Sequence, residues 1–446
     1  MRRPRHARAA AVGAVALIAG IVVPSSAAGA VSPESGLWWF DRGRIQEAHD
    51  AGFDGAGVKV AVIDSQINPD VVGLRGANLT LDDASYCIDP SGQPYPIVST
   101  DYVASSHGTA VVSMIAGTGD APAGGAPIKG VAPGAEVLYY NAGGVLDVVE
   151  AQDGGDAECL QSNGEELGDD GRFALDRAIS DAVADGADII SISSQSSTNV
   201  GKGLADAYAA GVVVVAGMSN EDSVTLWPAA LNGVVAVQAF GEDGKIQNGL
   251  NGEPNLTDDV VVAAPGLNLL LPGTPASWDA QRIGSGTSFA TPIVAGFLAV
   301  VKQKYPDATG AQLIQSLMHN TGTKGEHEPE WNSSTGYGAA SLTGMLAVDP
   351  TTYPDVNPLF DTEDPYAQPS LRQVDEAKAA LGGGQTTDPT TEPGADEPSS
   401  AAPLAPWLIG GGIVLVLLVA GGIVLAIALT RSSRRQATEQ GGNHGG

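Results

Sequence analysis

The sequence predicts an α/β domain built on a doubly wound, mostly parallel sheet with helices on both faces, followed by one C-terminal transmembrane helix. Short runs rich in β-branched residues alternate along the chain with longer runs of helical periodicity. Several short runs are apolar at consecutive positions, which is typical of strands buried on both faces. Because parallel neighbours need a crossover between them, the alternation indicates right-handed crossover helices on both faces of one sheet. An uncharged stretch near the C-terminus predicts the membrane span.

Four runs predict the strands of this sheet. They are short, they consist mainly of Val, Ile and Ala, and glycine or aspartate stands near their ends, as expected of buried strands. The four runs are VKVAVID (58–64), ADIISIS (187–193), GVVVVAG (211–217) and GVVAVQAF (233–240).

Helical patterns lie between and after these strands. RFALDRAISDAVADG (172–186) and GKGLADAYAAG (201–211) each end at a glycine suited to a helix C-cap. Two later runs, 288–305 and 310–320, complete the globular part near Ala347. We therefore predict that the domain occupies residues 31–348.

Both ends of the chain carry targeting features. Residues 1–30 combine four arginines, an apolar run and a final Ala-Gly-Ala, which is the layout of a cleavable secretory signal peptide. Within residues 404–430 the uncharged stretch is long enough, at about 1.5 Å per residue, to cross a hydrocarbon core about 30 Å thick. Three arginines open the tail 431–446, so the positive-inside tendency places this tail in the cytoplasm. We expect a single-pass protein of the cell membrane whose main domain is extracytoplasmic.

Two polar segments are expected outside the packed domain. Residues 349–403 are rich in Pro, Thr, Asp, Glu and Gly, which predicts an extended stalk. The acidic stretch 146–171 resembles a surface insertion; its carboxylates offer calcium ligands, but they do not follow an EF-hand spacing, and we favour a solvated loop. The formal net charge of −29 would repel phosphate backbones, so nucleic-acid binding is not expected.

The chain has two cysteines, Cys87 and Cys159, both in the predicted external domain. An oxidising compartment favours a disulfide between them. Chain entropy makes such a bridge worth roughly 4 kcal/mol if its geometry is unstrained. Two separate thiols remain the alternative.

Three residue types needed for nucleophilic catalysis follow one another along the chain. Asp64 follows a predicted strand, His107 stands at the expected start of a helix, and Ser288 opens another helix after a glycine-containing turn. Each alone has an ordinary structural explanation, such as a turn, a cap or a satisfied histidine. Together they supply a nucleophile, a base for its proton and a carboxylate to orient the base. Asn220 follows another buried strand, where its amide and the Ser288 N–H can stabilise a developing oxyanion.

The residues around these positions carry a family resemblance. VAVIDS, HGTAVVSMIAG and GTSFATPIVAG, within Leu37 to Ala347, resemble in order the three catalytic blocks of the subtilisin (S8) family of serine proteases. The resemblance implies a subtilisin-like fold, peptide-bond hydrolysis, and protein or peptide substrates, with no metal or organic cofactor. It carries over Asp64, His107 and Ser288 as the catalytic triad and Asn220 as the oxyanion-hole residue.

The architecture is most similar to that of the membrane-anchored mycosins of type VII secretion systems. The signal peptide, the short lead segment before Asp64, the proline-rich stalk and the single C-terminal anchor support this likeness. It implies secreted or membrane-proximal substrates and, as partners, components of a membrane secretion complex. The chain has two cysteines, fewer than expected of typical mycosins.

Several positions depart from the family pattern. Gln66 and Ser219 stand where glycine is usual, and SISSQSS (191–197) replaces a Ser-Leu-Gly-Gly run that forms one wall of the substrate cleft. Side chains there crowd a strand that binds an extended peptide through its backbone. We therefore expect a narrowed cleft with restricted specificity. The cleft residues are Ser193, Ser194, Gln195 and Ser196.

Two other functions stay open at this stage. The altered cleft is compatible with a weak or inactive protease that serves as a scaffold for a membrane secretion complex. An esterase using the same triad is less favoured, because the family cleft is built for extended chains.

Overall fold

The computed structural model describes the main body of the chain in several stretches. These are residues 33–82, 85–87, 93–143, 172–195, 200–221, 227–323, 325–364 and 366–382. All of them belong to the first of two compact units, Met1–Gln385, whereas the second unit, Thr386–Gly446, lies outside the described residues. The predicted signal peptide, acidic insertion, transmembrane helix and cytoplasmic tail also lie outside them. Among the helices that are described, none combines the length and apolar character needed to cross a bilayer.

A seven-stranded sheet forms the centre of the unit, and every pairing within it is parallel. Strand order reverses at β1, with β3 and β2 on one side and β4 to β7 on the other, so the predicted doubly wound sheet is confirmed. Across the sheet the strands are β2 (Leu79–Leu81), β3 (Glu136–Asn141), β1 (Lys59–Asp64), β4 (Ile189–Ile192), β5 (Val213–Gly217), β6 (Val235–Phe240) and β7 (Val262–Pro265).

The four predicted strands are β1, β4, β5 and β6, the consecutive centre of the sheet. Sequence patterns did not predict β2, β3 or β7. β3 reads EVLYYN, in which two tyrosines replace the β-branched residues of the central strands, although its last five residues are buried. The outer strands therefore depend more on their neighbours than on their own composition.

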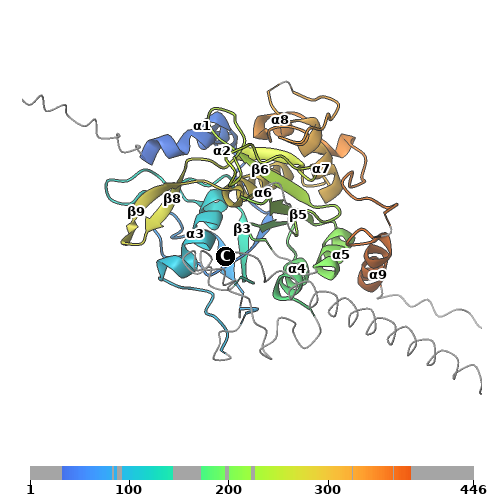
Figure 1. The fold of residues 1–446 in the computed structure, drawn as a ribbon, viewed down its shortest axis with the longest axis horizontal. Helices are drawn as coiled ribbons and strands as arrows, with labels where there is room; N and C mark the ends of the chain where they lie inside the picture. Colours follow the sequence, from blue (N-terminus) through green and yellow to red (C-terminus); the bar gives the residue numbers. More distant parts are fainter. Residues whose placement is uncertain are drawn as a thin grey trace, which may run out of the picture. The chain divides into compact units, whose positions relative to one another are not determined.

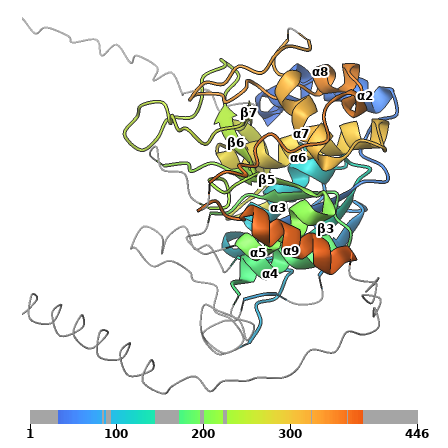
Figure 2. The ribbon, with the colours of Figure 1, turned by 90° about the vertical axis from the view of Figure 1, so that its right-hand side faces the viewer.

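Helices cover both faces of the sheet. Figure 2 shows α6 (Thr287–Lys304) and α7 (Gly310–His319) on one side, and α4 (Ala174–Ala184) and α5 (Gly201–Ala210) on the other. α3 (Tyr102–Ala116) packs against α6, which runs across β4, β5, β6 and β7. α6 is buried from Thr287 to Val301, so it is the central helix of its layer.

An antiparallel hairpin stands apart from the main sheet. β8 (Leu269–Thr274) pairs with β9 (Ser277–Gly284), and β9 leads directly into α6 (Figure 1). β8 is largely buried and packs on α3, whereas β9 is partly exposed. The hairpin was not predicted, because proline and glycine interrupt its apolar pattern.

The N-terminal lead is an integral part of the domain. It forms η1 (Pro33–Leu37), α1 (Trp38–Arg42) and α2 (Ile45–Asp50), and Trp39 and Phe40 are buried in the main core. The Trp38 indole N–H donates to the carbonyl of Leu267 at 3.1 Å. The lead segment is therefore part of the packed domain.

The C-terminal boundary predicted at residue 348 is wrong. The chain continues through α8 (Leu342–Ala347) and η3 (Pro350–Thr352) to α9 (Leu371–Gly382), which packs on α5 (Figure 2). Val374 on α9 is only 4% exposed. The Asn232 amide donates to the carbonyls of Asp361 and Pro369, at 3.0 Å each. The composition predicted a stalk because the segment is mostly polar. A few apolar contacts and non-local hydrogen bonds nevertheless hold it against the domain.

The docking of α9 yields a stability prediction. Val374→Ala removes two buried methyl groups and should lower the free energy of opening α9 by about 1–2 kcal/mol. Leu381→Ala on the same helix is the matched control, since Leu381 is 62% exposed. Hydrogen exchange of the α9 amides measures the opening. Equal effects of the two substitutions would contradict the docked arrangement.

Candidate active site

Asp64 is the last residue of β1, at the carboxyl edge of the sheet, and is 1% exposed. Its Oδ1 accepts a hydrogen bond from the Ser65 backbone N–H at 2.8 Å and from the Ser65 hydroxyl at 3.1 Å. These two hydrogen bonds hold the buried carboxylate in a fixed direction.

His107 lies on α3, but not at its start as predicted. The helix begins at Tyr102, where the Asp101 side chain caps it by accepting from the Ala104 N–H at 3.0 Å. The preceding polar residues concealed this first turn, because serines occur as often in loops as at helix starts. His107 therefore projects from a formed helix, and packing of that helix fixes its backbone.

The two groups meet in the structure. His107 Nδ1 lies 2.8 Å from Asp64 Oδ1, and because a carboxylate can only accept, Nδ1 is the donor. Nε2 is then the unprotonated nitrogen of the neutral ring. The close approach of α3 depends on Gly108, since a Cβ there would lie 2.0 Å from the Tyr139 hydroxyl on β3.

Opposing effects set the pKa of His107. Burial lowers this pKa, whereas the negative charge and hydrogen bond of Asp64 raise it, and the positive charge of Arg282 lowers it. The net result is a pKa raised above the ordinary value of histidine. Asp64 thus stabilises the imidazolium more than burial and Arg282 destabilise it.

Ser288 is the second residue of α6, as predicted, and is 9% exposed. Its hydroxyl donates to the Ser193 carbonyl at 3.2 Å, and the Ser193 hydroxyl donates to the Ser288 carbonyl at 2.8 Å. The rings of His107 and Phe289 are 6.2 Å apart, so the imidazole lies beside this first turn of α6. In the described structure the Ser288 hydroxyl does not hydrogen-bond to His107, and it must turn from Ser193 to do so.

Asn220 follows β5 and faces the N-terminus of α6. Its Oδ1 accepts from the Thr287 N–H at 2.9 Å, the Thr287 hydroxyl at 3.1 Å and the Gln247 amide at 3.0 Å. Three donors on one atom identify it as the oxygen and leave Nδ2 as a donor. The Ser288 N–H is among the first-turn donors of α6, which have no partner within their helix.

Sequence reasoning identified Asn220 but missed the groups that orient it, Gln247 and Thr287. Gly286 is also part of this arrangement, since a Cβ there would lie 3.8 Å from Asn220 Nδ2. The Gly-Thr pair before Ser288 was a signal for two of these groups. No sequence signal indicated Gln247, because it lies in a loop far from the other site residues in sequence.

The two unusual residues next to the site, Gln66 and Ser219, both find hydrogen-bond partners nearby. Gln66 is buried and donates to the Pro96 carbonyl at 2.6 Å. Ser219 is also buried, and its hydroxyl accepts from the Glu221 N–H at 3.1 Å. Both substitutions are therefore satisfied locally by backbone groups.

Of the four predicted cleft residues, Ser193 is buried against Ser288, Ser194 is half-buried and Gln195 is exposed. Ser196 lies outside the described residues. Among the three that are described, Ser193 alone hydrogen-bonds to Ser288.

Cys87 is fully buried and disulfide-bonded. Cys159, its predicted partner, lies outside the described residues. The pairing between these two positions stays a prediction.

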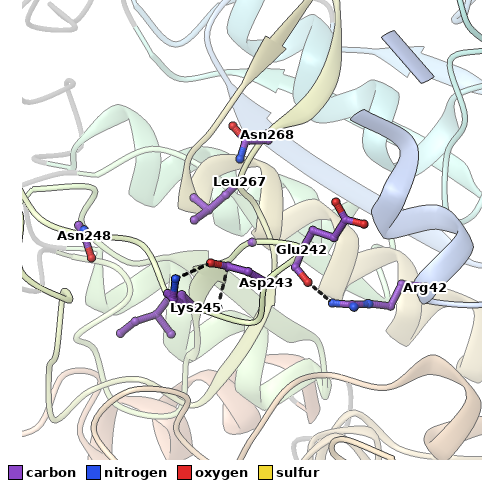
Figure 3. A pocket seen from close by; sticks show the side chains of 9 residues that line it. Arg42, Glu242, Asp243, Lys245, Asn248, Leu267 and Asn268 are labelled. Atoms are coloured by element: carbon purple, nitrogen blue, oxygen red, sulfur yellow. Dashed lines mark hydrogen bonds and ion pairs between the residues drawn. The ribbon is translucent and has the colours of Figure 1, made fainter. Parts of the chain in front are cut away.

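A cavity of about 650 Å³ is lined by Arg42 of α1 and by the loops around Asp243 and Asn268 (Figure 3). Arg42 donates to the Glu242 carbonyl at its edge, and Lys245 pairs with Asp243 at 2.9 Å. Its lining consists of Arg42, Gly241, Glu242, Asp243, Lys245, Ile246, Asn248, Leu267 and Asn268. None of the predicted site residues lines this cavity, so the predicted catalytic groups lie elsewhere.

Comparison with known proteins identifies the domain. Residues 55–338 match the subtilase family. The chain is 30% identical over 290 residues to the minor extracellular protease Epr of Bacillus subtilis (strain 168), a match covering 64% of this chain but 38% of that protein. It is also 30% identical over 293 residues to subtilisin Savinase of Lederbergia lenta, covering 64% of this chain and 91% of that protein.

Solved structures agree with the fold. Fervidolysin from Fervidobacterium pennivorans, described as a keratinolytic enzyme related to subtilisin, has a TM-score of 0.50 and 26% identity over 68% of this chain and 44% of that one. MycP1 from Mycobacterium smegmatis has a TM-score of 0.51 and 24% identity, over 74% of this chain and 88% of that one, which is a likeness of fold. The chain therefore belongs to the subtilase family, and its domain is that of a serine-type endopeptidase.

Proposed function

We propose that the protein is a secreted, membrane-anchored serine endopeptidase in which Asp64, His107 and Ser288 are the catalytic triad and Asn220 completes the oxyanion hole. The observation that carries this proposal is the 2.8 Å hydrogen bond from His107 to buried Asp64, beside Ser288 at the N-terminus of α6. Its substrates are proteins or peptides. The whole protein's activity is inferred from the domain, since the match to Epr covers 38% of that relative.

The first chemical step forms the acyl-enzyme. The Ser288 hydroxyl leaves the Ser193 carbonyl, gives its proton to His107 Nε2 and attacks the carbonyl carbon of the scissile peptide bond. The carbonyl π electrons move onto oxygen, where the Ser288 N–H and Asn220 Nδ2 stabilise the negative charge. As the tetrahedral intermediate collapses, the C–N bond breaks and the imidazolium protonates the leaving amine.

The second step releases the acid product. A water molecule gives a proton to His107 and attacks the acyl carbon, and the same oxyanion donors stabilise the new intermediate. Collapse breaks the bond to Ser288, whose oxygen recovers the proton from His107. Asp64 stabilises the imidazolium in both halves of the reaction and keeps Nδ1 protonated.

The cellular setting is proposed from the termini. A signal peptide at 1–30, a membrane helix within 404–430 and a basic tail would place the domain outside the cell on a single C-terminal anchor. This architecture supports a mycosin-like role in type VII secretion, with secreted or membrane-proximal substrates and contacts to the secretion complex. The side chains of Ser194 and Gln195, where the family usually has glycine or leucine, support restricted specificity.

A catalytically weak scaffold is the second candidate. The observation in its favour is that the Ser288 hydroxyl donates to Ser193 rather than to His107. A nucleophile held in this way is not activated until it turns toward the imidazole.

Labelling with a fluorophosphonate probe separates the two functions. We expect covalent labelling of the purified protein, and loss of labelling in both Ser288→Ala and His107→Ala, because the probe requires an activated serine. Ser277→Ala, which alters an exposed hydroxyl on β9, is the control that keeps labelling. A folded parent that stays unlabelled would favour the scaffold.

The raised pKa of His107 predicts the pH dependence of kcat/KM. His107 must be neutral to accept the Ser288 proton, so activity falls as pH drops through this pKa. Since Asp64 raises the pKa of His107, the midpoint of the acid limb should lie above about 6.5. Initial rates on one uncharged peptide measure it between pH 5 and 9. A midpoint below 6.5 would contradict the assigned balance of charges.

Removing the Asn220 amide tests the oxyanion hole. Asn220→Ala should lower kcat about 10²- to 10³-fold with a much smaller change in KM, because this donor acts chiefly in the transition state. Asn248→Ala, at an exposed position on the cavity of Figure 3, should leave both constants unchanged. Steady-state kinetics on one peptide provides the measurement, and a loss confined to KM would assign Asn220 to substrate binding instead.

A further inference from the structure

We propose that Arg282 determines specificity, by binding an aspartate or glutamate side chain just C-terminal to the scissile bond. The inference rests on the proposed function and deepens it. Three features carry it: the place of the guanidinium beside the path to Ser288, its contact with the helix of His107, and its lack of an ion-pair partner among the described residues.

The guanidinium lies beside the segment that leads to the nucleophile. Arg282 belongs to β9, which ends at Gly284, four residues before Ser288. A Cβ on Gly284 would lie 2.8 Å from Nη1 of Arg282. The guanidinium therefore lies next to Gly284, together with Leu271, along the backbone that leads to Ser288.

A second contact joins the Arg282 guanidinium to the helix that carries His107. Arg282 Nε donates to the Tyr102 hydroxyl at 2.5 Å, and Tyr102 is the first residue of α3, the helix that carries His107. The Tyr102 ring packs on Trp278 of β9, with 5.4 Å between ring centroids. Arg282 thus bridges the strand before the nucleophile and the helix of the base, and this anchoring lowers the entropic cost of binding a ligand.

No acidic side chain in the described part of the chain forms an ion pair with Arg282. The chain has 51 aspartates and glutamates against 22 lysines and arginines, yet Arg282 takes part in none of the ion pairs formed by the described residues. By contrast, Arg172 and Asp176 pair at 2.5 Å. Arg282 is half-buried, and its terminal N–H groups suit a carboxylate, which a guanidinium can bind through two hydrogen bonds.

The position relative to His107 indicates which half of the substrate it meets. Arg282 hydrogen-bonds to Tyr102 on α3, the helix that carries His107, so we place the guanidinium on the imidazole side of the site. The imidazolium protonates the leaving amine, and the leaving half of the substrate must therefore run on that side. The other half is expected along Ser193 and Gln195. Arg282 would then meet the first or second residue after the scissile bond.

The test compares paired peptides that differ only by glutamate or glutamine at the first or second position after the scissile bond. We expect kcat/KM to favour glutamate about tenfold for the parent, a value that allows for partial exposure of the charge pair. The preference should disappear in Arg282→Gln and persist in part in Arg282→Lys, which keeps the charge but not the two-point geometry. Arg372→Gln, exposed on α9 and paired with Glu376, is the control that keeps the full preference.

The ratio of kcat/KM for the two peptides distinguishes a loss of recognition from a folding defect, because a folding defect lowers both values alike. A second readout is the acid limb of kcat/KM on the glutamine peptide. Removing the Arg282 charge raises the pKa of His107, so this limb should move to higher pH in Arg282→Gln.

Several outcomes would overturn the inference. Equal rates on the paired peptides with normal hydrolysis would do so, as would a glutamate preference that survives in Arg282→Gln or one found only before the scissile bond. These results leave the proposed function intact. Absence of both hydrolysis and fluorophosphonate labelling would instead count against the proposed function itself.

Discussion

Parallel pairing of three neighbouring strands brings most of the active site together. β1, β4 and β5 lie side by side in register, with Ile63 opposite Ile192 and Ile192 opposite Ala216. Asp64 ends β1, and Ser193 and Asn220 follow β4 and β5, so all three lie at one edge of the sheet. A shift of one residue in this register would turn Asp64 away from His107. The chemistry therefore depends first on the buried, apolar centre of the sheet.

Two helices add the remaining groups by entering this edge from the same layer. α3 brings His107 to Asp64, and its approach is limited by the contact between Gly108 and Tyr139. α6 brings Ser288 with its first-turn N–H groups, and Asn220 ties that turn to β5 through Thr287. The buried carboxylate is thus compensated by an imidazole, and in the proposed mechanism the N-terminus of α6 stabilises a negative charge that develops only during reaction.

The described segments on both sides of the family domain pack against it. The lead contributes buried aromatic residues, and the C-terminal segment closes on α5 through α9. α5 begins at Gly201, soon after the predicted cleft residues in the sequence, and the last described helix packs against it. An anchor further along the chain would then hold the domain by a segment that is itself part of the fold.

Local patterns in the sequence determined the central strands, the main helices and which residues are proposed as the triad. They could do so because strand burial, helix periodicity and the three motif blocks are each contained within a few neighbouring residues. Only the tertiary structure decided where α3 begins, that residues 349–382 pack on the domain, and that Gln247 and Thr287 orient Asn220. It also decided that Arg282 on β9 hydrogen-bonds to Tyr102, 180 residues away. These features rest on contacts between distant segments, whose energy depends on packing geometry that no short window of sequence contains.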